Sequence, residues 1–282
     1  MRSTSPIGYS LFLLTAFLAW PPPVVLAAGE VEIRYLANAG FLIAAGDTKV
    51  LVDALYGDGI AGYPVVPPSL RRRVEAGEQE LAGVDLVLAS HRHGDHFDAH
   101  AVARHLGANQ DARFVSSEEA VASLAAVDPG LADRATGLWP PEGERASVEH
   151  AGIRVTALRL HHGDAPAQNL GLLVEISGLK VAHLGDTEVT AEDLRSLGLA
   201  DEGIDVALVP YWYFISSRLR SAIGELGALQ VVAMHLPAPD APPAYLAPAK
   251  SFDALVEAVR AADPEAWIPL RPLEERRFRA RS

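Results

Sequence analysis

Three histidines and an aspartate, close together in the sequence, are the residues whose types and spacing best suit metal binding. His91, His93, Asp95 and His96 lie within six residues, directly after a short apolar segment. Side chains two residues apart on an extended chain point to the same side, so His91 and His93 face one direction, and the turn that follows brings the other two round. The chain has only 10 histidines among 282 residues, so this density is far above chance. The spacing predicts a site for a metal cation.

The available donor types narrow the choice of metal. The chain has no cysteine, which excludes disulfide frameworks, thiolate metal sites and cysteine nucleophiles. Any metal must therefore be held by imidazole and carboxylate groups. That donor set suits Zn²⁺, and also Mn²⁺ or Fe²⁺.

Composition and charge exclude other classes of protein. Hydrophobic residues make up 49% and charged residues 21% of the chain, as in globular proteins with a sizeable core. The 36 acidic residues exceed the 24 lysines and arginines by 12. This balance disfavours the electrostatic attraction to phosphate on which nucleic-acid-binding proteins rely. We therefore expect no nucleic-acid partner.

Short strand-like segments, rich in β-branched residues and bounded by turns, must position the metal-binding side chains. We predict strands over residues 31–35, 41–44, 49–53, 86–89, 113–115, 153–160, 171–176, 180–184, 205–209 and 230–234. We predict helices over residues 97–106, 117–127, 218–229 and 252–261, a short helix after Thr190, and loops at the proline-rich stretches 64–68 and 237–248. The first three strands form an antiparallel meander. Two groups of strands, each followed by helices, predict two sheets packed face to face with helices outside.

Residues 1–28 differ from the rest of the chain. Arg2 is their only charge, nine of the ten residues 11–20 are apolar, and small residues stand at 27–28, which predicts a cleaved signal peptide. The alternative is a membrane anchor, but three prolines at 21–23 end the run short of the roughly 20 apolar residues that a spanning helix needs. We expect a single domain over 29–282, periplasmic or secreted, without a stable membrane span after cleavage. Loss of Arg2 changes the formal charge from −12 to −13.

The motif His91-x-His93-x-Asp95-His96 after an apolar strand resembles the signature of the metallo-β-lactamase fold. That resemblance implies an α/β protein, a four-layered αβ/βα sandwich with its metals at one edge. Further landmarks of the family follow in order, each at a strand end: His161-His162-Gly163, Gly185-Asp186-Thr187 and His235. The resemblance covers about residues 31 to 270. Within the superfamily, residues 38–41 and 184–187 are similar to the group of L-ascorbate-6-phosphate lactonase and N-acyl-phosphatidylethanolamine phospholipase D.

The resemblance implies two divalent metal ions. The first is held by His91, His93 and one of His161 or His162, the second by Asp95, His96 and His235, and Asp186 bridges both. Of the two adjacent histidines we prefer His162, because it immediately precedes Gly163 and because strand alternation places it on the face of Leu158 and Leu160.

The remaining histidines are expected outside the ligand set. His183 lies on the opposite face of its strand from Asp186, so a structural or supporting role is expected. His100, His105 and His150 are expected at the surface.

The resemblance also implies the chemistry. A metal-bound hydroxide attacks an ester, lactone or phosphodiester of a small-molecule or lipid-like substrate, while Asp95 orients the hydroxide and accepts its proton. His93 stands where redox members of the fold carry glutamate, and Asp186 provides a bridge that the antibiotic-hydrolysing branches lack. The alternative is a non-catalytic metal-binding envelope protein that keeps the fold. A decayed site would lose one of its seven ligand positions, whereas all seven are filled here.

Two aromatic-rich segments are candidates to border this site. Residues 55–68 follow the third strand, where members of this fold often let a loop overhang the metals. The run 211–214 contains four consecutive aromatic residues. Either it packs beneath a helix, or it forms a wall of the substrate pocket in which Tyr211 or Tyr213 donates to an oxyanion.

Overall fold

The computed structural model describes residues 29–163 and 166–280, so the predicted signal peptide over 1–28 lies outside the described residues. The described strands form two sheets, with the orders β13-β1-β2-β3-β4-β5-β6 and β12-β11-β10-β9-β8-β7. The strands are β1 (Glu30–Ala37), β2 (Gly40–Ala45), β3 (Thr48–Val52), β4 (Leu86–Leu88), β5 (Arg113–Ser116), β6 (Ala135–Gly137), β7 (Arg145–His150), β8 (Ile153–Arg159), β9 (Leu170–Ile176), β10 (Leu179–His183), β11 (Val206–Pro210), β12 (Gln230–Met234) and β13 (Glu275–Arg279).

The helices occupy the connections between these strands. They are α1 (Pro68–Ala76), α2 (Ala99–Ala108), α3 (Glu118–Val127), α4 (Ala191–Ser196), α5 (Trp212–Ile215), α6 (Arg220–Gly224), α7 (Pro243–Leu246) and α8 (Phe252–Ala262). Short 3₁₀ turns cover Gln79–Leu81, Pro129–Arg134 and Leu199–Glu202. Within the described ranges, no helix is long and apolar enough to cross a membrane.

Both sheets combine antiparallel and parallel pairing, and the strand directions determine which carboxyl ends lie at the same edge of a sheet. In the first sheet β1, β2 and β3 form the predicted antiparallel meander, whereas β3, β4, β5 and β6 run parallel. Parallel neighbours need crossover connections, which α1, α2 and α3 supply. In the second sheet β8 and β10 both run antiparallel to β9, and β10, β11 and β12 run parallel. The carboxyl ends of β8, β10, β11 and β12 therefore share one edge.

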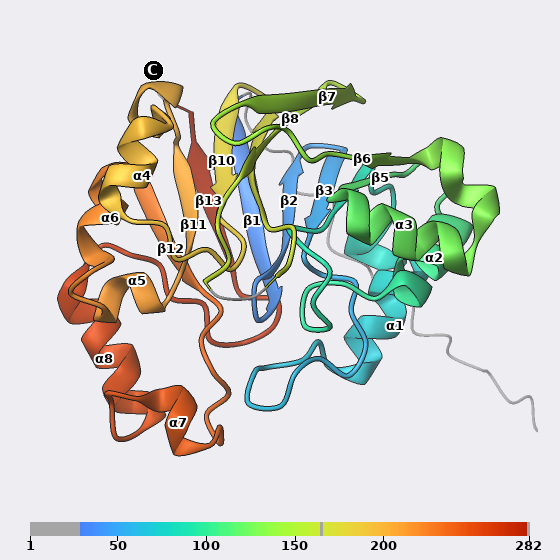
Figure 1. The fold of residues 1–282 in the computed structure, drawn as a ribbon. Coiled ribbons are helices and arrows are strands. Elements are labelled where there is room, and N and C mark those ends of the chain that lie inside the picture. Colours follow the sequence, from blue (N-terminus) through green and yellow to red (C-terminus); the bar gives the residue numbers. More distant parts are fainter. Residues whose placement is uncertain (1–28, 164–165, 281–282) are drawn as a thin grey trace, which may run out of the picture.

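The two sheets pack face to face, and helices cover both outer faces (Figure 1). Side chains such as Ile43 of the first sheet and Val174 of the second form a core between the sheets. A second core packs α1, α2 and α3 on the first sheet, and a third packs α4, α5 and α8 on the second. Burying one apolar face of each sheet and helix in this way drives the assembly of the layers. The predicted four-layered α/β sandwich is confirmed.

Several elements differ from the sequence prediction, and two of them, β13 and α1, bury few apolar residues that could reveal them. The strand β13 was not predicted because only Phe278 of its five residues is buried. Helix α1, also not predicted, carries three arginines and buries only Leu70 and Val74. The predicted helix 218–229 is reduced to α6, and the predicted loop 237–248 contains α7.

One histidine was assigned to the wrong environment. His105, predicted at the surface, is completely buried on α2, where its Nδ1 lies 2.6 Å from the carbonyl oxygen of Val74. This contact joins α2 to α1. His100, on the same helix, is exposed as predicted.

Candidate metal centre

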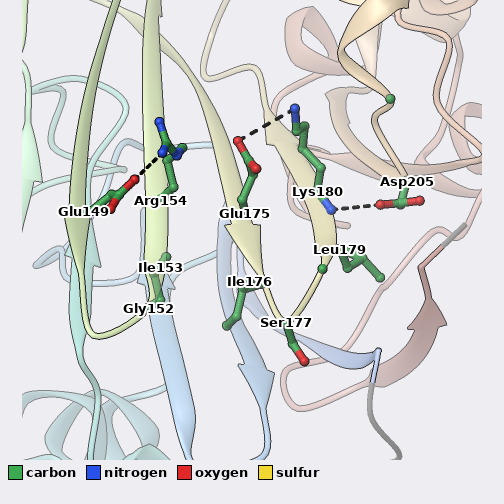
Figure 2. A pocket seen from close by; sticks show the side chains of 12 residues that line it. Glu149, Gly152, Ile153, Arg154, Glu175, Ile176, Ser177, Leu179, Lys180 and Asp205 are labelled. Carbon is green, nitrogen blue, oxygen red and sulfur yellow. Dashed lines mark hydrogen bonds and ion pairs between the residues drawn. The ribbon is translucent and has the colours of Figure 1, made fainter.

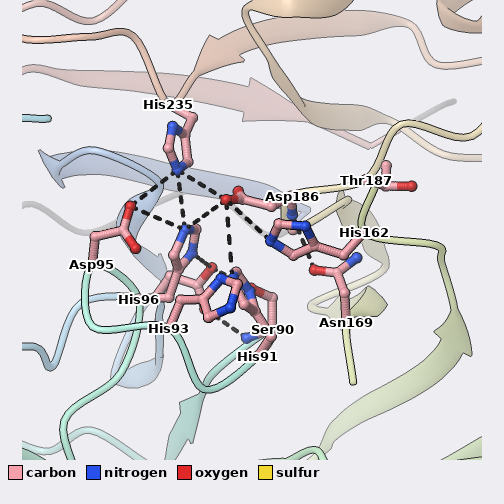
Figure 3. Close-up of polar contacts among 12 residues, drawn as sticks. Ser90, His91, His93, Asp95, His96, His162, Asn169, Asp186, Thr187 and His235 are labelled. Carbon is pink, nitrogen blue, oxygen red and sulfur yellow. Dashed lines mark hydrogen bonds and ion pairs between the residues drawn. The ribbon is translucent and has the colours of Figure 1, made fainter. Parts of the chain in front are cut away.

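The predicted ligands follow strand ends in both sheets, and their side chains lie close together. His91 and His93 follow β4 in the first sheet, and the residues from the second sheet follow β8, β10 and β12. Figure 3 shows the side chains of His162, Asp186 and His235 pointing toward the cluster that follows β4. The site is therefore assembled only when the two sheets pack together.

The seven predicted ligands fall into two groups. Within each group, one potential ligand atom of every residue lies within 4.8 Å of the others. The first group is His91, His93 and His162, and the second is Asp95, His96, Asp186 and His235. The two groups match the division into two metal positions that the family resemblance implies. Whether each residue ligates a metal stays a prediction.

Asp186 reaches from one group into the other. Its Oδ2 lies 3.1 Å from His235 Nε2 and 3.3 Å from His96 Nε2 in the second group. The same oxygen lies 3.7 Å from His162 Nε2 and 4.0 Å from His91 Nε2 in the first. One carboxylate oxygen thus lies within 4.0 Å of histidine nitrogens in both groups, as the bridging role implied by the family resemblance requires.

His162, and not its neighbour His161, lies in the first group. The ring of His162 lies 4.8 Å from the rings of both His91 and His93, centroid to centroid. The side chain of His161 is exposed, and its carbonyl oxygen accepts hydrogen bonds from Thr187 Oγ1 and Glu188 N. The geometry thus agrees with the preference for His162 drawn from strand alternation.

The donor atoms fit divalent cations. Among the described residues, Asp95 Oδ1, Asp186 Oδ1 and His162 Nε2 are buried without any hydrogen-bond partner. The Nε2 atoms of His96 and His235 face each other at 3.1 Å. Buried polar atoms without partners are costly, and nitrogen and oxygen donors converging in this way are typical of Zn²⁺, Mn²⁺ or Fe²⁺ sites.

Asp53, which the sequence analysis did not select, supports both groups. Its Oδ2 lies 2.7 Å from His96 Nδ1, and it accepts a 2.6 Å hydrogen bond from the hydroxyl of Ser90. The Ser90 oxygen in turn lies 3.0 Å from His91 Nδ1. Carboxylates and hydroxyls that hold Nδ1 leave Nε2 of each ring directed at a metal. The available signal was an aspartate at the end of a buried strand, as for Asp186.

A buried amide orients the predicted catalytic aspartate. Asn38 Nδ2 donates to both the carbonyl oxygen and Oδ2 of Asp95, and the carbonyl oxygen of Asn38 accepts from His235 N. Asn38, Asp53 and His235 all have positive φ, at 53°, 47° and 59°. Such strained backbone at non-glycine residues concentrates at functional sites. Sequence analysis used Asn38 only as part of a family motif.

The bridging position of Asp186 depends on the residue before it. Gly185 has a φ of 58°, and a Cβ there would lie 2.2 Å from Asn169 Oδ1. That same amide oxygen accepts a hydrogen bond from Asp186 N. Any larger residue at 185 would therefore displace the side-chain amide oxygen of Asn169, which accepts the hydrogen bond from Asp186 N.

His183, expected to be structural, is buried and contacts the carbonyl oxygen of Ala39 at 2.9 Å.

The buried charges perturb one another. Burial lowers the pKa of His235, but the charge of Asp186 and hydrogen bonds to Asp186 and Asp95 outweigh it and raise this pKa to about 9. Burial raises the pKa of Asp186, yet the charges of His235 and His96 hold it well below its usual range. Without metal, the second group therefore carries protons that a cation must displace on binding.

Aromatic side chains surround His235. The ring of Tyr63, from the loop after β3, lies 4.3 Å from the His235 ring, and the ring of Trp212 lies 5.2 Å from it. The hydroxyl groups of Tyr211 and Tyr213 donate to the carbonyl oxygens of Tyr245 and Val189. Both hydroxyls are therefore engaged with backbone, and either would have to break that hydrogen bond to donate to an oxyanion.

A depression at the opposite end of the second sheet is not part of this site. It is lined by charged residues near the turns β7–β8 and β9–β10, as Figure 2 shows. The charged side chains pair with one another: Arg154 pairs with Glu149, and Lys180 Nζ lies 3.7 Å from Glu175. The carboxylate of Asp205 accepts a hydrogen bond from the backbone N–H of Lys180.

Comparison with known proteins agrees with this geometry. Residues 48–264 match a family described as the beta-lactamase superfamily domain. The chain belongs to the beta-lactamase superfamily. Among its relatives is a UPF0173 metal-dependent hydrolase of Symbiobacterium thermophilum, 31% identical over 182 residues that cover 64% of this chain and 71% of the relative. Another, from Thermococcus onnurineus, is 26% identical over 214 residues, covering 73% and 84%.

Solved structures share the fold of this superfamily member. Igni18, a metallo hydrolase from Ignicoccus hospitalis, aligns with a TM-score of 0.56 at 19% identity, over 89% of this chain and all of its own. The metallo-beta-lactamase fold protein YhfI from Bacillus subtilis aligns at 0.54 and 15%, over 88% of this chain and 99% of its own. The predicted fold is confirmed, and the chain is a metal-dependent hydrolase of the superfamily.

Proposed function

We propose that this protein is a dinuclear hydrolase that cleaves an ester, lactone or phosphodiester bond in a small or lipid-like molecule, with Zn²⁺ as the preferred metal. The observation that carries the proposal is the position of Asp186 Oδ2, 3.1 Å from His235 Nε2 in one group and 3.7 Å from His162 Nε2 in the other. A single-metal site needs no such bridging oxygen.

The metal ions, when bound, supply an acidified water and polarise the substrate oxygen. The chain itself supplies the proton acceptor. Asp95 Oδ1 is buried without a hydrogen-bond partner among the described residues, while Asn38 Nδ2 donates to Oδ2 of the same carboxylate. One oxygen of Asp95 is thus held in place and the other is available to take a proton.

Metal content tests the two-group arrangement. We expect about two ions per chain in elemental analysis of the metal-loaded protein, since each group offers a full set of donors. His93→Ala should remove chiefly one ion and His235→Ala chiefly the other, whereas His100→Ala, at an exposed position, should retain both. Zero metal in the wild-type protein under metal-replete conditions would refute the hydrolase proposal.

Turnover separates catalysis from metal binding alone. The metal-loaded protein should hydrolyse at least one of a panel of lactones, thioesters and bis(p-nitrophenyl) phosphate. Asp95→Asn should lower turnover by about 10²- to 10⁴-fold, because an amide cannot accept the proton. Metal content must be measured on the same sample, since Asp95 is also a predicted ligand. Full metal with full turnover in Asp95→Asn would show that another group is the proton acceptor.

The adjacent histidines provide a matched pair. His162→Ala should lower both metal content and turnover, whereas His161→Ala should leave both near the wild-type values, because only His162 contacts the cluster. The competing function, a non-catalytic metal-binding envelope protein, predicts bound metal without turnover on any member of the panel.

A further inference from the structure

One tyrosine outside the predicted ligand set lies directly against the candidate metal centre. The ring of Tyr63 contacts His235 edge to face, with centroids 4.3 Å apart and an interplanar angle of 80°. Tyr63 belongs to the loop between β3 and α1, so its position was set by tertiary packing and not by sequence spacing. The ring is partly exposed, which leaves it accessible to a substrate.

The loop holds Tyr63 in place from both sides. The carbonyl oxygen of Gly62 accepts a 2.8 Å hydrogen bond from Ala238 N, and the carbonyl oxygen of Pro64 accepts one from the hydroxyl of Tyr56. Gly62 has a φ of 96°, and a Cβ there would lie 3.0 Å from the ring of Tyr245. The ring of Tyr245 in turn packs on Tyr63 at 5.3 Å. Tyr63 is therefore preorganised beside His235.

The hydroxyl of Tyr63 has no structural hydrogen bond within the described part of the fold. Among the described residues none forms a hydrogen bond with it, whereas the hydroxyls of Tyr56, Tyr211 and Tyr213 all donate to backbone carbonyls. The ring that contacts His235 thus carries a hydroxyl donor that no described residue engages.

We propose that Tyr63 donates a hydrogen bond from its hydroxyl to the substrate oxygen that gains negative charge in the transition state. The O–H bond stays intact, so Tyr63 is a donor and not an acid. A donor held in position before the reaction stabilises the developing charge without reorganisation. This inference rests on the proposed hydrolytic function and assigns to Tyr63 the role that sequence analysis considered for Tyr211 or Tyr213.

The test compares Tyr63→Phe with Tyr245→Phe. The first removes the hydroxyl and keeps the ring on His235, and the second removes the hydroxyl of the neighbouring ring. With the best substrate of the panel, Tyr63→Phe should lower kcat by about 10- to 100-fold while KM changes little, since a hydrogen bond to a charged oxygen is lost only in the transition state. Tyr245→Phe should match the wild type. Metal content should be equal in all three proteins.

A binding measurement provides a second readout that does not depend on turnover. Inorganic phosphate, a tetrahedral anion, is titrated calorimetrically into the metal-loaded proteins, and Tyr63→Phe should bind it more weakly than Tyr245→Phe does. An unchanged kcat in Tyr63→Phe, or a loss equal to that of Tyr245→Phe, overturns the inference. If the wild type hydrolyses nothing, the proposed function fails, and equal phosphate affinity of wild type and Tyr63→Phe then overturns the inference separately.

Discussion

Asp53 shows how one residue without a predicted role can govern a whole site. Its carboxylate contacts His96 in the second group directly and is linked through the Ser90 hydroxyl to His91 in the first. It also accepts a 2.6 Å hydrogen bond from Ser90 N, so it holds the chain segment that carries the motif. Both groups of predicted ligands are therefore held by this one side chain.

We predict that Asp53→Asn weakens binding of both metal ions by about 10- to 100-fold, the range found when a supporting carboxylate of a metal-bound histidine is lost. The amide lacks the charge that orients the His96 ring. Competition with a chelator measures each affinity, and circular dichroism checks the fold. Asp47→Asn, at an exposed position on the same hairpin, is the control. Loss of only one ion's affinity would contradict the shared support.

At the scale of elements, a buried polar contact joins two of the helices that cover the first sheet, α1 and α2. His105 of α2 is completely buried and contacts the carbonyl oxygen of Val74 in α1. Burial lowers the pKa of His105, so the side chain is neutral in the folded protein near neutral pH. In the unfolded chain the same group titrates near 6.5. Below that pH the unfolded state binds a proton that the folded state resists, and stability falls.

We therefore predict that the contribution of His105 to the free energy of unfolding decreases as the pH falls. His105→Leu should lower the free energy of unfolding by about 1–3 kcal/mol at pH 8, because the buried hydrogen bond is lost. The difference from wild type should shrink between pH 7 and pH 5, since leucine takes up no proton. Urea unfolding at each pH measures it. His100→Leu on the exposed face should show a difference that does not vary with pH, and a constant difference for His105→Leu would refute the prediction.

At the scale of the whole molecule, the candidate metal centre joins the two sheets. Four of the seven predicted ligands follow β4 of the first sheet, and three come from the strand ends of the second. Metal bound to both would link the two halves of the sandwich at one edge. Anything that binds only the folded state stabilises it by mass action.

Metal removal should therefore lower global stability. At a free metal concentration 1,000-fold above Kd, binding adds about 4 kcal/mol to the free energy of unfolding. Calorimetric melting of chelator-treated and Zn²⁺-loaded protein measures the difference as a shift in Tm. Asp186→Ala should lose most of this shift because it removes the bridging carboxylate, whereas His100→Ala should retain it. Equal melting of the two wild-type samples would show that metal does not link the sheets.

Export is a separate proposal about the whole chain. The apolar run over 11–20 and the small residues at 27–28 support cleavage of residues 1–28. N-terminal sequencing of the native protein should find a mature start near Ala28 or Gly29, in the periplasmic or secreted fraction. Recovery of intact Met1 with the membranes would instead support retention as an anchor.

The sequence by itself indicated two packed sheets with helices outside and one cluster of candidate ligands, because both rest on local patterns. The other candidate ligands, His162, Asp186 and His235, came from the resemblance to the metallo-β-lactamase fold. Alternating short apolar strands and turns predict a layered sandwich, and the spacing of His91, His93, Asp95 and His96 is a feature of six consecutive residues. Strand parity also favoured His162 over His161. The elements that went unpredicted, such as β13, bury too few apolar residues to leave a periodic pattern.

Only the tertiary structure decided which residues support and surround that site. Asp53 meets His96 across 43 residues of chain, and Tyr63 meets His235 although a whole sheet separates them in the sequence. Which tyrosine is proposed as a hydrogen-bond donor to the substrate depended on whether its hydroxyl already donates to a backbone carbonyl, as those of Tyr211 and Tyr213 do. Hydrogen bonds and ring contacts of this kind depend on where crossovers bring distant loops together. Local periodicity carries no information about those distances.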